Sequence, residues 1–139
     1  MKGLFVDTAG WMALADGNDP AHDASRSARD RWLEQGGILV TSDYVLDEAL
    51  TLVRARLGLQ AARQWWDQVG TSPRVRVEWI DHTRAEKART WFFQWSDKTF
   101  SFTDCTSFVI MKELRLKAAL TVDRHFQQAG FQILPRPVR

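Results

Sequence analysis

Five short apolar runs recur along the chain, and longer segments with helical spacing separate them. The runs lie at residues 4–6, 38–40, 75–80, 118–122 and 132–134, each bounded by polar or turn residues, as strands are. Strands that alternate with helices predict a mainly parallel, twisted sheet, because parallel strands need crossover connections. We therefore predict an α/β fold of three layers (α/β/α), with four to five strands and helices on both faces of the sheet.

Two of the helical segments carry large aromatic side chains on apolar stripes. One stripe is Ala62, Trp65, Trp66 and Val69, and the other is Ala85, Ala88, Trp91, Phe92 and Trp95. Exposed aromatic rings can stack on nucleic acid bases, but spacing of this kind is typical of a face packed on a core. We predict that the aromatic residues of these stripes, Trp65, Trp66, Trp91, Phe92 and Trp95, belong to the core.

The size and composition of the chain are those of one globular unit. Its 139 residues are 45% hydrophobic, and no repeat or low-complexity tract divides them. We expect a single domain over residues 1–139, with a frayed tail over about 135–139. The lone Cys105 excludes an intramolecular disulfide and a sulfur-rich zinc site. Because no apolar run suits a signal peptide or a membrane span, we expect a cytoplasmic protein without a membrane partner.

Three acids stand at positions that a solvated surface does not explain. Asp7 and Asp123 each follow a strand-like run, and the carboxyl edge of an open α/β sheet is where ligands bind, although either acid could simply cap a helix. Asp104 shares a face with Phe108 and Met111 in a helix expected to begin near Thr103. A carboxylate that faces inward needs a bound cation or a basic partner, and a structural salt bridge remains an alternative.

A fourth acid is harder to choose from spacing alone. In the helix expected around residue 50, an apolar stripe is formed by Leu46, Ala49, Leu50, Val53 and Leu57. Glu48 lies nearly opposite that stripe, and its face is low in charge, so it suits the wall of a cleft as well as a wet surface. Asp47 stays open as an alternative.

Carboxylates gathered at one site repel one another, and hard cations relieve the repulsion. Oxygen ligands favour Mg²⁺ or Mn²⁺ over zinc, and such metals promote phosphodiester hydrolysis. The chain has 19 basic and 17 acidic residues, a net charge of +2. With four acids neutralised by metal, the remainder carries +6, which suits a phosphate backbone.

Four segments jointly resemble the PIN-domain family, especially its VapC-type toxins. They are Phe5-Val6-Asp7-Thr8, Thr41 to Glu48, Ser101 to Phe108, and Thr121-Val122-Asp123-Arg124-His125-Phe126. The resemblance spans nearly the whole chain and implies a PIN-like domain. It rests on four acids in the right order and on an Asp-x-x-Phe motif after the fourth main strand.

The resemblance implies an acidic quartet of catalytic residues, Asp7, Glu48, Asp104 and Asp123, and so selects Glu48 over Asp47. Asp7 and Asp104 would be the principal metal ligands, with Glu48 and Asp123 binding directly or through water. Thr8 and Ser107 would be supporting hydroxyls. Many relatives carry Ser or Asn where this chain has Ala9, so one supporting hydrogen bond is absent.

The resemblance also implies an activity and its partners. Similar proteins are Mg²⁺-dependent endoribonucleases in which Mn²⁺ can substitute, and they hydrolyse RNA with a metal-activated water. They are toxins of type II toxin–antitoxin modules, held inactive by a cognate antitoxin and usually dimeric. Arg124, His125 and Lys98 are candidate RNA contacts. Phe93 falls off its helical stripe and, if exposed, would mark a dimer or antitoxin surface.

Two other classes of function remain alternatives. A catalytically silent adaptor for RNA or protein would keep the fold, but the presence of all four acids argues against it. A phospho-acceptor signalling domain would also have an Asp at a strand end. Against that class, Asp7-Thr8 lacks an adjacent acid pair, and no Lys ends a later strand.

Overall fold

The structure is a computed structural model that describes residues 2–137. Its strands are β1 (Gly3–Val6), β2 (Ile38–Ser42), β3 (Val75–Glu78), β4 (Ala118–Leu120) and β5 (Gln132–Leu134). Its helices are α1 (Thr8–Ala15), α2 (His22–Glu34), α3 (Asp43–Leu57), α4 (Leu59–Thr71), α5 (His82–Gln94), α6 (Phe102–Glu113) and α7 (Arg124–Gln128). Residues 135–137 of the predicted tail have no helix or strand, and 138–139 lie outside the described residues.

The strands form one five-stranded sheet in the order β3-β2-β1-β4-β5, and neighbouring strands are parallel. Phe5 in β1 lies opposite Val40 in β2 and opposite Ala119 in β4, so β1 is the central strand. The predicted α/β class and parallel sheet are confirmed. The predicted runs at 75–80 and 118–122 are each two residues too long, because the ladders stop at Glu78 and Leu120.

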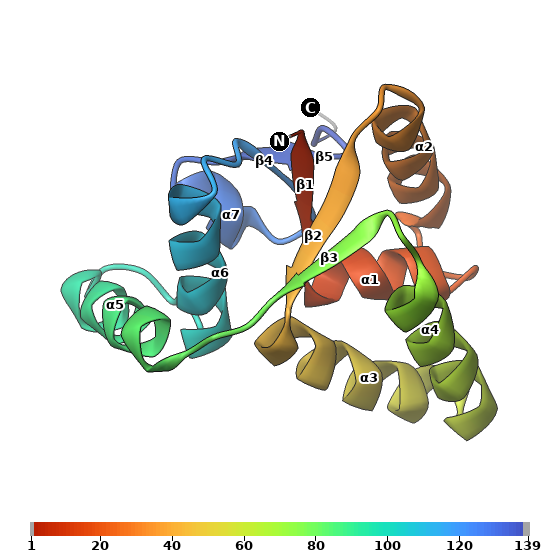
Figure 1. Cartoon of the computed structure of the whole chain (residues 1–139), viewed down its shortest axis with the longest axis horizontal. Helices are drawn as coiled ribbons and strands as arrows, with labels where there is room; N and C mark the ends of the chain where they lie inside the picture. The colour runs from red at the N-terminus through yellow and green to blue at the C-terminus, as the bar shows by residue number, and fades with distance from the viewer. Residues whose placement is uncertain (1, 138–139) are drawn as a thin grey trace.

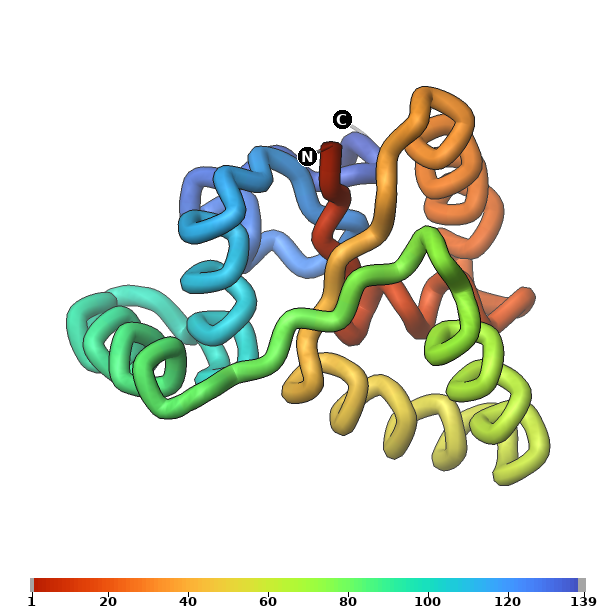
Figure 2. Tube along the Cα trace, in the orientation of Figure 1, coloured from red at the N-terminus to blue at the C-terminus, as the bar shows by residue number. Residues whose placement is uncertain are grey.

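Helices cover both faces of this sheet, as Figure 1 shows, with α6 and α7 on one side and α1, α2 and α4 on the other. Strand order explains the division. The chain moves outward from β1 to β2 and β3, then crosses to the other side of the sheet on its way to α5 (Figure 2). Because such crossovers are right-handed, reversing the direction of travel moves the later helices to the opposite face.

The core gathers around the central strand and α6. Leu4, Phe5 and Val6 are completely buried, as parallel strands covered on both faces must be. Phe108 of α6 is also fully buried, and its ring packs edge to face against Phe126 of α7. The Phe126 ring in turn stacks on Phe5 of β1. None of the helices within residues 2–137 is both long enough and apolar enough to span a bilayer.

Three aromatic residues that we predicted to be core are exposed, and a fourth, Trp91, is half-buried. Trp65 is 7% exposed, as predicted, but Trp66, Phe92 and Trp95 are 45%, 39% and 40% exposed. The prediction was wrong because a wide apolar stripe does not say how much of its width a neighbouring element covers. Phe93, which falls off its stripe, is 74% exposed.

Candidate metal centre

The point where the sheet reverses its direction of winding lies between β1 and β4. Connections leave these adjacent strands toward opposite faces, and the crevice outside their carboxyl ends is the usual ligand site of such sheets. Asp7 follows β1 directly. We predicted that Asp123 directly follows β4, but Thr121 and Val122 lie between the strand and the acid. Both acids nevertheless reach the same crevice.

A cleft of about 410 Å³ occupies this edge of the sheet, between the starts of α1, α6 and α7 and one face of α3. The residues that line it are Asp7, Thr8, Ala9, Met12, Asp19, Val45, Glu48, Leu52, Arg56, Ser101, Thr103, Asp104, Ser107, Val122, Asp123 and His125. We call it the acidic cleft. All four acids selected from the sequence line it.

Asp7 lies at the bottom of this cleft and is 5% exposed. Its Oδ1 accepts a hydrogen bond of 2.8 Å from the backbone N–H of Gly10, so it caps α1. Its Oδ2 accepts another, of 2.8 Å, from the Thr121 hydroxyl. Burial raises the pKa of Asp7 to about 7, and the charges of Asp123 and Asp104 add to the rise, while the two hydrogen bonds oppose it.

Asp104 is held by the local geometry of the start of α6. Its side chain accepts from the Ser101 N–H at 3.1 Å, and its own N–H donates to the Ser101 hydroxyl at 2.9 Å, which completes a capping box. The side chain is 13% exposed. Burial raises the pKa of Asp104, and Asp123 adds to the rise, whereas Ser101 and His125 lower it.

His125 links two of the acids. Its Nδ1 lies 2.8 Å from Oδ2 of Asp104 and 3.3 Å from Oδ1 of Asp123. Because an ionised carboxylate can only accept, Nδ1 must carry a hydrogen, and the other ring nitrogen lies 3.1 Å from the Thr99 hydroxyl. A carboxylate oxygen of Asp104, one of Asp123 and a ring nitrogen of His125 lie within 4.8 Å of one another. The ring that we had considered as an RNA contact is thus directed at the acids.

Glu48 stands on the α3 wall of the acidic cleft. It is exposed, and its Oε1 accepts a hydrogen bond of 2.9 Å from the Thr8 hydroxyl. Asp47 instead lines a separate pocket beside Trp66 and Trp79. Of the two acids between which spacing could not choose, only Glu48 therefore lines the acidic cleft.

Of the remaining predicted site residues, some line the acidic cleft and others do not. Ser107 lines the cleft but is buried, and its hydroxyl donates to the Thr103 carbonyl at 3.0 Å. Ala9 lines the cleft without a side-chain hydrogen-bonding group. Among the described residues, Arg124 and Lys98 are not part of the lining, and Lys98 donates to Asp97 at 3.1 Å.

Sequence reasoning missed two charged residues of the cleft, Asp19 and Arg56. Arg56 could have been found, because it lies on the same face of α3 as Glu48. Asp19 lies in the loop between α1 and α2, where its carboxylate accepts from the Ala21 N–H at 2.8 Å. No periodicity relates a loop residue to a distant cleft.

The residues present fit a divalent cation. Carboxylate groups of Asp7, Glu48, Asp104 and Asp123 line one cleft, a donor set that suits hard cations such as Mg²⁺ and Mn²⁺. The raised pKa values of Asp7 and Asp104 describe the cost of placing these carboxyl groups together and out of water. A cation between them offsets that cost by favouring the ionised forms.

Comparison with known proteins places this geometry in a family. The model of the PIN domain matches residues 4–132, nearly the whole chain. The chain belongs to the PIN-domain family. The family resemblance inferred from the four acidic segments is therefore confirmed.

Relatives of this PIN domain carry more specific names. Two curated proteins, from strains CDC 1551/Oshkosh and ATCC 25618/H37Rv of Mycobacterium tuberculosis, are named 23S rRNA-specific endonuclease VapC20. Each is 34% identical to this PIN domain over 128 residues, which cover 92% of this chain and 95% of the relative. The crystal structure of Mycobacterium tuberculosis VapC20, described as a sarcin–ricin loop cleaving toxin, matches with a TM-score of 0.82 at 32% identity, covering 92% of this chain and 95% of that one.

Proposed function

We propose that this PIN domain is a divalent-metal-dependent endoribonuclease and the toxin of a type II toxin–antitoxin module. The observation that carries the proposal is the convergence of Asp7, Glu48, Asp104 and Asp123 on one cleft at the switch point of the sheet. The similarity of this PIN domain to VapC20 along 92% of the chain supports the same conclusion. We place the activity in the cytoplasm, where the proposed RNA substrate is.

Asp7 and Asp104 would be the principal ligands of Mg²⁺ or Mn²⁺, with Glu48 and Asp123 completing the site directly or through water. When bound, such a cation lowers the pKa of a water molecule and neutralises charge on a phosphoryl group. The hydrogen bonds to Asp104 from Ser101 and His125 fix its carboxylate before a ligand arrives. Thr8 does the same for Glu48. Such prior orientation lowers the entropic cost of binding.

The names of the relatives indicate the substrate class. We propose that the substrate is 23S rRNA and that the cleaved segment is its sarcin–ricin loop, by analogy with what VapC20 is described as cleaving.

The test is cleavage of a labelled 23S rRNA fragment by the purified protein with Mg²⁺ or with EDTA. Asp7→Asn and Asp104→Asn should each lower the cleavage rate by about 100-fold or more, since even the partners of metal ligands matter by 10–100-fold. Asp47→Asn is the matched control, because Asp47 lines a different pocket, and it should cleave normally.

Two outcomes would contradict the assignment. Equal cleavage by the wild type and by Asp104→Asn would remove the acids from the reaction. Tight binding of the fragment without Mg²⁺-dependent cleavage would instead favour an RNA-binding adaptor.

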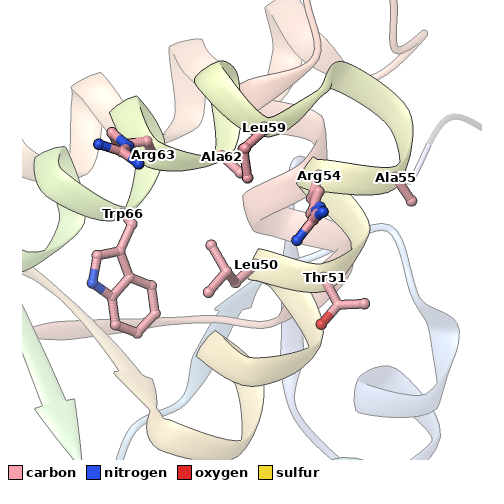
Figure 3. A pocket seen from close by; sticks show the side chains of 8 residues that line it. All are labelled: Leu50, Thr51, Arg54, Ala55, Leu59, Ala62, Arg63 and Trp66. Atoms are coloured by element: carbon pink, nitrogen blue, oxygen red, sulfur yellow. The ribbon is translucent and has the colours of Figure 1, made fainter.

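We further propose that the antitoxin docks an amphipathic segment in the groove between α3 and α4. This groove, about 710 Å³, is lined by Leu50, Thr51, Arg54, Ala55, Leu59, Ala62, Arg63 and Trp66 (Figure 3). Leu59 and Trp66 are 58% and 45% exposed, so they offer apolar contact, and Arg54 and Arg63 favour an acidic partner. Leu59→Asp should abolish co-purification with the antitoxin and leave RNA cleavage intact; unchanged co-purification would place the antitoxin elsewhere.

The exposed aromatic residues of α5 support a second protein contact, which we propose to be a homodimer. We call Phe92 and Phe93 of α5, together with Trp95, which directly follows its last residue, the α5 patch. Beside it α5 carries Glu86 and Arg89, which form an ion pair with each other at 3.2 Å, so a second copy across a two-fold axis would meet charges of both signs there.

A further inference from the structure

One basic residue stands alone in the acidic cleft. Among the described residues that line it, Arg56 is the only lysine or arginine. Arg56 is exposed, on the last turn of α3, and no ion pair joins it to a carboxylate within residues 2–137. Asp19 also lines the cleft, but its carboxylate oxygen caps the backbone of its own loop.

Helix α3 fixes the separation between this guanidinium and the acids. Val45, Glu48, Leu52 and Arg56 share one face of α3, and all four line the cleft. Glu48 and Arg56 are eight residues apart, which places their Cα atoms about 12 Å apart along the helix axis. Along α3 the cleft therefore has an acidic end at Glu48 and Arg56 at the other end, with Leu52 between them, while Asp19 lines the cleft from the loop before α2.

Such polarity suits a polyanionic strand whose phosphates have two different surroundings. The phosphate to be cleaved must meet the acidic end, where only a bound cation can offset the repulsion between the phosphate and the carboxylates. The phosphates that follow lie beyond the cation and need another source of positive charge. Arginine serves this purpose well, because its planar guanidinium can donate two parallel hydrogen bonds to phosphate oxygens.

We propose that Arg56 binds a phosphate of the RNA strand outside the scissile bond and so fixes the direction in which the substrate lies along α3. The inference rests on the proposed endoribonuclease function and adds a binding subsite to it. Arg56 acts on binding of the strand and takes no part in bond cleavage.

A purely structural role for Arg56 leads to different expectations. The methylene groups of an arginine can cover apolar surface, here beside Leu52, while the charge stays in water. In that case truncation would lower stability without a specific effect on RNA. Arg56→Lys would keep most of that apolar cover and the charge, and the salt dependence of RNA binding by Arg56→Ala separates loss of charge from loss of packing.

The experiment compares Arg56→Ala, Arg56→Lys and a matched control, Arg54→Ala. Arg54 is two residues away on the same helix but lines the groove between α3 and α4 (Figure 3). Cleavage of an RNA fragment containing the sarcin–ricin loop gives kcat and KM in Mg²⁺. Binding of the same fragment is measured by fluorescence anisotropy at several salt concentrations, in an Asp104→Asn background that does not cleave.

Arg56→Ala should raise KM about tenfold and leave kcat almost unchanged, because a contact made equally in the ground and transition states affects binding alone. The slope of log K against log salt should fall by about 0.7, the value for one phosphate contact to a single strand. Arg56→Lys should keep the slope, and Arg54→Ala should match the wild type. Thermal unfolding of each variant shows whether the fold is kept.

An unchanged KM and salt slope in Arg56→Ala, or an equal change in Arg54→Ala, would overturn the subsite. Failure of the proposed function is distinguishable from this result. If the wild type does not cleave but Arg56→Ala still loses one phosphate contact, the nuclease proposal fails and the subsite stands. If the wild type cleaves and Arg56→Ala binds normally, the subsite fails and the nuclease proposal stands.

Discussion

The carboxyl group of Asp7 holds the first turn of α1 and also faces two other acids. One of its oxygens accepts from Gly10 and the other from Thr121. A carboxylate oxygen has two lone pairs, so each oxygen keeps one for a further partner. The two roles that the sequence offered for this residue, helix cap and cleft acid, therefore occur together. Its position directly after a strand predicted both.

The pKa of Asp7 leads to a prediction about stability. In the metal-free protein it is raised to about 7 from an ordinary value of 3.8. Between these values the folded state holds a proton that the unfolded state has lost, so unfolding releases it. The free energy of unfolding should therefore fall as pH rises from about 4 to about 7, by at most about 4 kcal/mol from this group.

Urea unfolding of the wild type and of Asp7→Asn in EDTA checks this expectation. Asparagine does not titrate, so the stability of the wild type relative to the variant should decrease across this pH range. Parallel pH profiles for the two proteins would show that Asp7 ionises as freely in the folded state as in the unfolded state.

At the scale of elements, the acids are positioned by the starts of three helices. Asp7, Asp104 and Asp123 cap or support the first turns of α1, α6 and α7. Capping signals are local, so the sequence predicted helix starts near these residues. It did not predict that the imidazole of His125 would join two of them, because that contact depends on how α6 and α7 pack against each other.

The packing of α1 against the sheet leads to a second prediction. A Cβ atom on Gly10 would lie 2.1 Å from the carbonyl oxygen of Leu120 in β4, a backbone atom that cannot move aside. Gly10→Ala should therefore lower the free energy of unfolding by about 3 kcal/mol, the upper part of the usual range for overpacking.

Chemical denaturation measures this loss, with Gly70→Ala as the control. Gly70 is also helical, in α4, but a Cβ atom there meets nothing within 4 Å. Gly70→Ala should stabilise the protein by about 0.5–1 kcal/mol. A Gly10→Ala protein as stable as the wild type would mean that α1 can shift away from β4.

The whole molecule shows which features a single sequence can reveal. Alternating apolar runs and helical stripes predicted all five strands and the parallel sheet, because periodicity is a local property. Exposure of Trp66 and Phe92 could not be predicted in this way, since it depends on which element covers each side chain. The contribution of Asp19 to the cleft depends likewise on the path of a loop.

The α5 patch leads to a prediction about assembly. Phe93 is 74% exposed, and Phe93→Asp places a charge where a second copy would make apolar contact, so it should convert the dimer to a monomer. Sedimentation velocity measures the change. Trp79→Asp is the control, because Trp79 is 69% exposed but lies outside α5, and it should remain dimeric. A monomeric wild type would refute the proposed homodimer.

Anomalous diffraction from a crystal soaked in Mn²⁺ shows whether the acids of this PIN domain share a divalent cation. We expect an anomalous peak in the acidic cleft, within coordination distance of carboxylate oxygens of Asp7 and Asp104, about 2.0–2.2 Å. The peak should be lost in crystals of Asp104→Asn. Density for the same acids with no ion between them, or a peak that persists without Asp104, would mean that these acids do not hold a shared cation.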